Sequence, residues 1–482
     1  MNLVSDPWIP VVMQDGKHRE VSLDAVFRDG ESIADLAATP CQRIALTRLL
    51  ICIAQAALDG PVDEADWLAC RSRLADAALA YLAKWRHRFN LFGEHAFLQV
   101  DGLDASPNAL ADKVDLTLAC GNNPTLFDHA ATPGGRVYAN ARTTLNLLVY
   151  QMFSPGGLIG TTQWEGALTE KTSEHSPCLE GSMLHTFFRG DVLFGTIHLN
   201  LLTRAQVQTL GNSSWGCPFW ELDNYGKAQL DINATTYLGR LVPVTRAVRF
   251  VEQSPKVVLA AGTHYAKLPI SREPAGTLVE AGTGSGKHIS YLSVNPAKHL
   301  WRELYSVLAM HQADKPGGAL CLDHLRTVGI KIFDIWTGGL AADKAKLIDM
   351  AEWNMTLPAE LLDTTVLARY QNGVIQANSA HGTLVYAIKA YSEIQMADPV
   401  WRSKADSTFW SSLDTSADIL IACVLEGDSS IPSRWIPVIQ RALLAAYSQT
   451  CPHTTPRQIQ AYAQGLKIIE SWKGKSSHGS RD

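Results

Sequence analysis

Apolar residues recur at helical spacing along two early stretches of the chain. Residues 41–59 and 65–85 repeat them every three or four positions, which predicts two helices with buried faces. Residues 1–30 instead alternate short apolar runs with turn-forming residues, a pattern typical of a hairpin that leads into a helix. Residues 121–181 differ again, because glycine, proline, asparagine and serine crowd around one helix-like stretch at 141–153. Long glycine-rich loops on a rigid body favour a functional role.

The C-terminal part of the chain has an almost purely helical pattern. Residues 182–350 mix strand-like and helix-like runs, whereas four amphipathic segments follow Leu357. Those segments are residues 367–394, 416–426, 435–449 and 456–472. The pattern predicts an α+β protein, with a mixed α/β N-terminal domain at 1–355 and a C-terminal four-helix bundle at 356–482.

Composition narrows the class of protein. The 482 residues are 46% hydrophobic and 18% charged, with a net charge of -5, as expected for a globular chain without an overall basic field. Nucleic-acid binding would therefore depend on local patches. The nine cysteines form no CxxC pair, and neither a signal peptide nor ~20 consecutive apolar residues is evident. We expect a cytoplasmic protein without a membrane span, a metal or another cofactor.

The stretch AGTGSGK at 281–287 looks like the phosphate loop of an ATPase. Such a loop needs a following helix and a Ser or Thr after the lysine to hold magnesium, but His288 comes next. Residues 277–280 and 289–294 both have strand patterns, so a glycine-tipped hairpin is favoured over an ATPase. Since the chain has no GxSxG or HExxH motif either, a hydrolase is also disfavoured.

Several motifs, each weak alone, occur together in a recognisable order. They are Met1–Leu3, Asp6–Val11, Leu50–Gln55, Asn123–His129, Ser154–Gly160, Ser182–Gly190, Thr196–Leu202, His299–Trp301 and Gly338–Leu340. In this order and spacing the chain resembles the CasA family, the large subunit of the type I-E CRISPR surveillance complex Cascade. The resemblance extends over essentially the whole length.

The resemblance implies a subunit with no catalytic residues. Proteins of this family inspect double-stranded DNA for the PAM, the short motif beside the target, and help to open the duplex for an R-loop. The implied partners are crRNA, double-stranded target DNA, the helicase-nuclease that such a subunit recruits, and the other Cascade subunits: the backbone, the small-subunit dimer and the handle-binding subunit. A scaffold that makes only protein contacts remains an alternative.

The resemblance also assigns residues to DNA. They are Gly156, Gly157, Gly160, Lys267, Asp343 and Lys344. The glycines let backbone approach a groove closely, and the minor groove presents a degenerate pattern that suits tolerance of several PAMs. The wedge that separates bases is expected at 338–344, with Asp343 and Lys344 where relatives carry amides. The simpler alternatives are a surface turn and a solvated lysine.

A second loop is assigned to crRNA and PAM-proximal DNA. It consists of Leu126, Phe127, Asp128 and His129. Phe127 suits stacking on an unpaired base, although a lone Phe more often packs inward. Arg136 and Arg142 lie close by in sequence and suit phosphates.

Overall fold

The computed structural model describes residues 1–104, 106–117, 135–211, 214–310, 316–427 and 429–474. The chain forms two compact units. The first comprises Met1–Ala297 and Ala309–Leu357, and the second comprises Lys298–Leu308 and Pro358–Asp482. The second unit thus includes a segment that the sequence pattern placed in the N-terminal domain.

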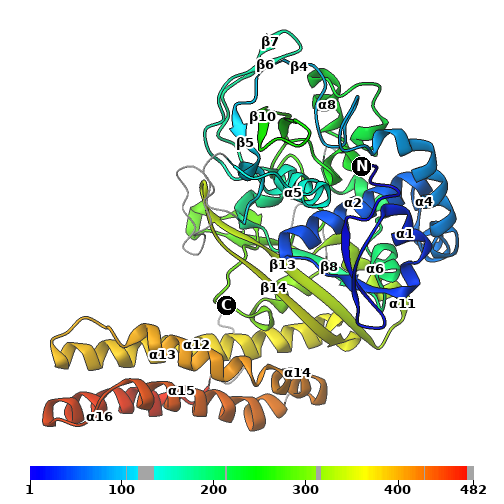
Figure 1. Ribbon diagram of the computed structural model, residues 1–482. Coiled ribbons are helices and arrows are strands. Elements are labelled where there is room, and N and C mark those ends of the chain that lie inside the picture. The colour runs from blue at the N-terminus through cyan, green and yellow to red at the C-terminus, as the bar shows by residue number, and fades with distance from the viewer. Residues whose placement is uncertain (105, 118–134, 212–213, 311–315, 428, 475–482) are drawn as a thin grey trace. The chain divides into compact units, whose positions relative to one another are not determined.

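The first unit mixes helices with small antiparallel sheets (Figure 1). Its helices are α1 Leu23–Arg28, α2 Pro40–Leu58, α3 Glu64–Ala69, α4 Arg71–Trp85, α5 Asn140–Phe153, α6 Leu193–Leu199, α7 Arg204–Gln208, α8 Lys227–Asn233, α9 Tyr237–Leu241 and α11 Leu325–Val328. The predicted helix at 65–85 is present but divided at Cys70 between α3 and α4.

The strands of the described residues form five sheets. Their orders are β2(His18–Val21)-β1(Ile9–Met13)-β3(Ile33–Leu36), β5(Ala109–Leu110)-β10(Lys256–Ala261)-β9(Arg246–Phe250), β11(Leu278–Ala281)-β12(His288–Tyr291), β14(Lys346–Pro358)-β13(Ile332–Asp343)-β8(His185–Arg189) and β4(Leu103–Asp104)-β6(Gln163–Trp164)-β7(Ala167–Leu168). The N-terminal hairpin predicted from the alternating pattern is β1–β2, with Ile9 opposite Val21.

Helix α2 is the central element of the first unit's core. Pro40 begins it, and a capping box between Thr39 and Gln42 satisfies backbone groups at its first turn. Its length and composition would suffice to cross a membrane, contrary to the sequence-based expectation, but 72% of it is buried inside the protein, as for a core helix. The bent pair of helices at 402–414 and 417–426 passes the same test only if it is counted as one span.

A buried ion triad joins α2 to the rest of the first unit. Arg48 and Arg240 place guanidinium nitrogens 2.8 and 2.7 Å from the two carboxylate oxygens of Glu273. Burial alone would raise the pKa of Glu273, but the two positive charges outweigh that effect and lower it to about 2. Arg240 also donates to the backbone oxygen of Ala266 at 2.9 Å, which ties the triad to the segment that carries Lys267.

Apart from Pro358, which ends β14, the described residues of the second unit form helices and the turns between them. Its helices are α10 Leu304–Leu308, α12 Thr364–Gln395, α13 Arg402–Asp414, α14 Ala417–Glu426, α15 Ile436–Thr450 and α16 Pro456–Ser471. Helix α12 packs against α16, and α13 packs against α15 (Figure 1). The prediction of four helices overlooked α13, which meets α14 at a 49° bend.

Tryptophan packing explains why Lys298–Leu308 belongs with the second unit. The indole nitrogen of Trp301 donates to Asp414 at 2.7 Å, and its backbone oxygen accepts the hydroxyl of Tyr370 at 2.6 Å. The ring also packs against Trp410 and, edge-on, against Trp435. These buried aromatic contacts hold the segment in the second unit, although in sequence it lies between parts of the first unit.

Candidate nucleic-acid interface

The glycine loop, residues 154–160, leaves the end of α5 and pairs with a neighbouring backbone segment. Gly157 N donates to Ser173 O at 3.3 Å, and Ile159 N donates to Thr172 O at 2.9 Å. A Cβ on Gly156 would lie 2.8 Å from Ser173 O, and Gly157 has a φ of +149°. Both positions therefore require glycine for structural reasons. Gly160 differs, because a Cβ there would meet nothing within 4 Å.

The long hairpin β13–β14 ends in a two-residue turn at Lys344 and Ala345 (Figure 1). Lys344 has a left-handed backbone conformation, with a φ of +55°. The side chains of Asp343, Lys344 and Lys346 are all exposed. We call Asp343–Lys346 the hairpin tip. Exposed charges at a protruding turn suit contact with a phosphate backbone.

Residues 338–343 of the predicted wedge belong to strand β13, and Lys344 lies in the turn that follows. A Cβ on Gly338 would lie 2.6 Å from the Trp336 ring, and one on Gly339 would lie 2.7 Å from Met183 O. These glycines permit close packing inside the sheet rather than a turn. Leu340 is only 2% exposed.

The structure brings the glycine loop and the hairpin tip together. The Cβ position of Gly156 is 4.0 Å from Lys344 O, and that of Gly157 is 3.7 Å from the Ala345 side chain. Two of the three segments assigned to DNA from the sequence therefore meet at one place. Gly160, Asp343 and Lys344 are exposed there.

Lys267 lines a cavity together with the segment that pairs with the glycine loop. Its side chain is half-buried, and its neighbours Ala266 and Leu268 are held through their backbones by Arg240 and Glu180. Glu180 Oε1 accepts Leu268 N at 3.4 Å. Burial, reinforced by the charge of Glu273, raises the pKa of Glu180 to about 7.

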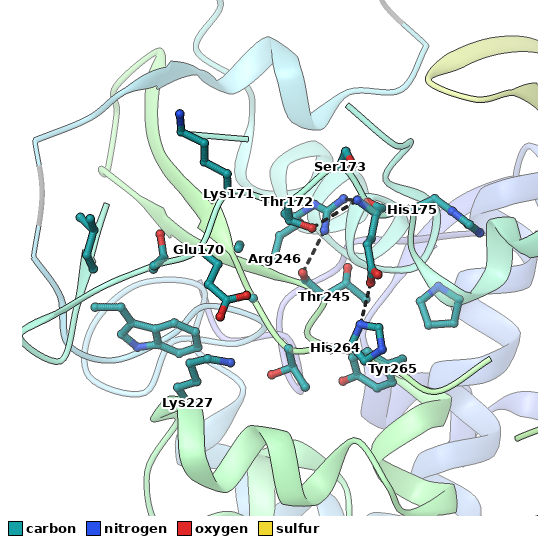
Figure 2. Close-up of a pocket in the computed structure, with 18 of the residues that line it drawn as sticks. Glu170, Lys171, Thr172, Ser173, His175, Lys227, Thr245, Arg246, His264 and Tyr265 are labelled. Atoms are coloured by element: carbon teal, nitrogen blue, oxygen red, sulfur yellow. Dashed lines mark hydrogen bonds and ion pairs between the residues drawn. The ribbon is translucent and has the colours of Figure 1, made fainter. Parts of the chain in front are cut away.

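A cavity of about 480 Å³ adjoins Lys267 (Figure 2). It lies between residues 164–177 and 245–267, with Lys227 contributed by α8. His264 Nδ1 lies 2.6 Å from the Glu174 carboxylate, whereas Lys171 extends away from the other labelled side chains (Figure 2). The segment Thr172–Glu174 thus both lines the cavity and pairs with the glycine loop.

Arg246 connects the cavity wall to the base of the glycine loop. This buried guanidinium donates to Pro155 O at 3.5 Å and also to Glu174 O. Burial lowers the pKa of Arg246. Because these two bonds go to backbone oxygens, they hold the glycine loop and the segment it pairs with at fixed positions.

The loop assigned to crRNA, which comprises Leu126, Phe127, Asp128 and His129, lies outside the described residues. Of the two arginines nearby, Arg142 places its guanidinium 2.9 Å from the Asp115 carboxylate. Burial alone would raise the pKa of Asp115, but hydrogen bonds from Thr117 and Arg142 lower it. The charge of Arg142 is thus already paired within the protein. Arg136 N donates to Asp112 Oδ1 at 3.0 Å.

The phosphate-loop lookalike is a hairpin, as predicted. Strands β11 and β12 pair antiparallel from Leu278 opposite Tyr291 to Ala281 opposite His288. Between them, Gly282 and Gly284 have φ values of +84° and +57°. Because a strand follows the loop where a phosphate-binding site needs a helix, this geometry offers no cradle for ATP phosphates. Lys287 instead pairs with Glu280 at 2.8 Å.

Four residues behind the interface had no predicted role: Glu180, Ser182, Arg240 and Arg246. Ser182 opens the motif Ser182–Gly190, but no pattern in the sequence gives any of the four this role, because each acts on the backbone of a distant segment. Among the described residues, no group of three or more His, Cys, Asp or Glu side chains could hold a metal ion. Cys178 is buried, and burial raises its pKa to about 12.

Comparison with known proteins gives consistent results. Residues 2–449 match the family of the CRISPR-associated protein Cse1. The CRISPR-associated protein CasA/Cse1 of Thermus thermophilus is 27% identical over 391 residues, which cover 75% of this chain and 72% of that protein. Cse1 of Thermobifida fusca has a similar structure, with a TM-score of 0.81 at 18% identity and coverage of 98% and 96% of the two chains. A chain of a CRISPR RNA-guided surveillance complex has a TM-score of 0.76 at 18% identity, with coverage of 98% and 99%. These likenesses confirm the predicted α+β fold class.

Proposed function

This chain belongs to the CRISPR-associated Cse1 family, and from that premise we propose that it is the large subunit of a crRNA-guided type I-E Cascade complex. Within that complex it recognises the PAM in double-stranded DNA and helps to start the unwinding that forms the R-loop. It then recruits the helicase-nuclease for antiviral defence. The chain itself breaks no bond, and it acts in the cytoplasm.

The observation that carries this proposal is the meeting of the glycine loop with the hairpin tip. Backbone at Gly156 and Gly157 lies against Lys344 and Ala345, which come from a distant part of the sequence. A side-chain-free loop beside a protruding charged turn suits a minor groove, where backbone approaches the base edges and a wedge replaces base stacking.

Each assigned residue has its own part in this proposal. The open space in front of Gly160 admits a groove wall, and Lys267 supplies a point charge for a phosphate or a minor-groove acceptor. Asp343 and Lys344 stand at the tip, where the wedge enters the duplex. Leu126, Phe127, Asp128 and His129 are proposed to contact crRNA and PAM-proximal DNA.

The partners proposed for the chain are crRNA, target DNA, the helicase-nuclease and the backbone, small and handle-binding subunits of the complex. One chain of similar fold is part of a CRISPR RNA-guided surveillance complex. This likeness supports assembly with crRNA and other subunits. The proposed function needs neither a metal nor another cofactor in this chain.

The test uses the assembled complex with its crRNA and duplexes that carry a matched target beside randomised flanking bases. Selection of particular flanking bases among bound duplexes supports the proposal, and indifference to them supports a scaffold that makes only protein contacts. Gly160→Leu should weaken binding to the selected duplexes while complex assembly stays intact. Gly286→Leu is the matched control, because a Cβ there also meets nothing within 4 Å.

A further inference from the structure

Ser182 has a backbone conformation that a serine adopts only at a cost. Its φ is +53°, and it follows Gly181, whose φ is +58°. The left-handed region is strained for a residue with a Cβ, whereas glycine enters it freely. A serine at this position therefore indicates a role for its side chain.

The hydroxyl of Ser182 bonds both backbone groups of Ala342. It donates to Ala342 O at 3.1 Å and accepts from Ala342 N at 2.9 Å. Ala342 is the last residue of β13 before the hairpin tip. A single side chain thereby satisfies a donor and an acceptor that a neighbouring strand would otherwise pair.

The register of the sheet explains why Ala342 needs this partner. Strand β8 accompanies β13 only from Asp334 opposite Arg189 to Gly338 opposite His185. Beyond Gly338, β13 continues to Asp343 without β8 beside it. The Ser182 hydroxyl thus extends support from the β8 side to the base of the hairpin tip.

The segment that carries Ser182 also holds the other two elements of the interface. We call Ser173–Ser182 the connecting segment. Ser173 O accepts Gly157 N, and Ser176 N donates to Ser154 O at 3.0 Å, so the glycine loop is fixed at two points. Glu180 accepts the backbone N–H of Leu268, next to Lys267. The glycine loop, the residue after Lys267 and the residue before the hairpin tip are thus all bonded to this one segment.

We propose that Ser182 is a positioning residue whose hydroxyl holds the hairpin tip in place against the glycine loop during duplex opening. This inference rests on the proposed function. A wedge separates base pairs only if it resists the force of restacking, so a tip without this support still reaches DNA but opens it slowly. The hydroxyl therefore affects strand separation more than initial binding.

The test compares three variants in the assembled crRNA complex. Ser182→Gly removes the hydroxyl and relieves the left-handed strain, Ser182→Ala removes the hydroxyl and keeps the strain, and Ser293→Ala is the matched control. The Ser293 hydroxyl donates to Gly181 O at 2.6 Å, so this bond lies in the same cluster but goes to a residue outside the hairpin. Strand opening is followed by 2-aminopurine fluorescence beside the PAM, and initial binding is followed by gel shift.

Both Ser182 variants should open the duplex about tenfold more slowly, as expected for the loss of a hydrogen-bonded support, with initial binding within about twofold of the original. Ser182→Gly should melt at the same temperature as the original chain or higher, which shows that the fold is intact. Unchanged opening rates in both Ser182 variants, or slowing in Ser182→Gly alone, would overturn the role of the hydroxyl. If the unaltered complex opened DNA equally with any flanking bases, the proposed function would fail, and this inference with it.

Discussion

Gly156 lies so close to Lys344 that the Cβ position of the glycine is 4.0 Å from the backbone oxygen of the lysine. Gly156 follows helix α5, and Lys344 lies in the turn between β13 and β14. Because they lie so close, the glycine loop and the hairpin tip form one continuous surface. Neither turn is distinctive in sequence alone. The mechanism proposed for the chain depends on this relationship.

Gly156 should tolerate no side chain. In Gly156→Ala, the new Cβ would lie 2.8 Å from Ser173 O and would force the pairing with the connecting segment apart. We expect a loss of about 1–3 kcal/mol in the free energy of unfolding, as for other overpacked sites. Urea denaturation of the chain measures it. Gly160→Ala is the control and should change stability little, so an equal loss in both variants would contradict the packing argument.

Lys267 should contribute a charge contact with DNA. In Lys267→Gln, the slope of log K against log salt should decrease in magnitude by about 1, because one counterion fewer is released per lost phosphate contact. Affinity titrations of the assembled complex at several salt concentrations measure the slope. Lys287→Gln is the control, since Lys287 pairs with Glu280 on the other hairpin. An unchanged slope for Lys267→Gln would contradict a contact between Lys267 and a DNA phosphate.

Glu273 should make stability depend on acid pH. Its pKa is about 2 in the folded protein against an ordinary value of 4.5, so its contribution is complete above about pH 5 and is lost as the pH falls toward 2. Urea denaturation at successive pH values should show this loss. In Glu273→Gln, two buried guanidiniums lose their counter-charge, and unfolding should become easier by about 3–5 kcal/mol at neutral pH.

A matched control exists for this variant as well. Glu280→Gln removes a carboxylate from the exposed ion pair with Lys287, and such pairs contribute roughly 0–1 kcal/mol. If Glu273→Gln cost no more than Glu280→Gln, the buried triad would have no special role in the core.

Lys287 should have no part in nucleotide chemistry. Because β12 follows the glycine-rich turn, we expect the assembled complex without its helicase-nuclease to hydrolyse no ATP above background. Lys287→Ala should leave DNA binding unchanged. Turnover that disappears in this variant while DNA binding persists would restore the ATPase alternative.

Local pattern was sufficient to predict several elements. Alternation around AGTGSGK correctly indicated the β11–β12 hairpin, and helical spacing correctly indicated α2 and α5. Helix α13 was overlooked because its buried residues, Ala405, Phe409 and Leu413, recur only every fourth position among polar neighbours. An apolar stripe only one residue wide gives a weak helical periodicity in the sequence.

The interface itself was less accessible to sequence reasoning. Gly338 and Gly339 have the composition of a turn, but in the structure they avoid clashes with Trp336 and Met183 within a strand. The contact between Gly156 and Lys344 joins segments far apart in sequence, and no local pattern encodes it. Ser182 belongs to the motif Ser182–Gly190, but nothing in the sequence reveals its left-handed backbone or its bonds to Ala342.

The most direct test of the central claim is the affinity of the assembled complex for matched duplexes that differ only in the bases beside the target. The account predicts that preferred flanking bases tighten binding by at least about tenfold, and that Gly160→Leu removes most of this preference while Gly286→Leu retains it. Equal affinity for every flanking sequence, in a complex that still assembles with its crRNA, would contradict the account.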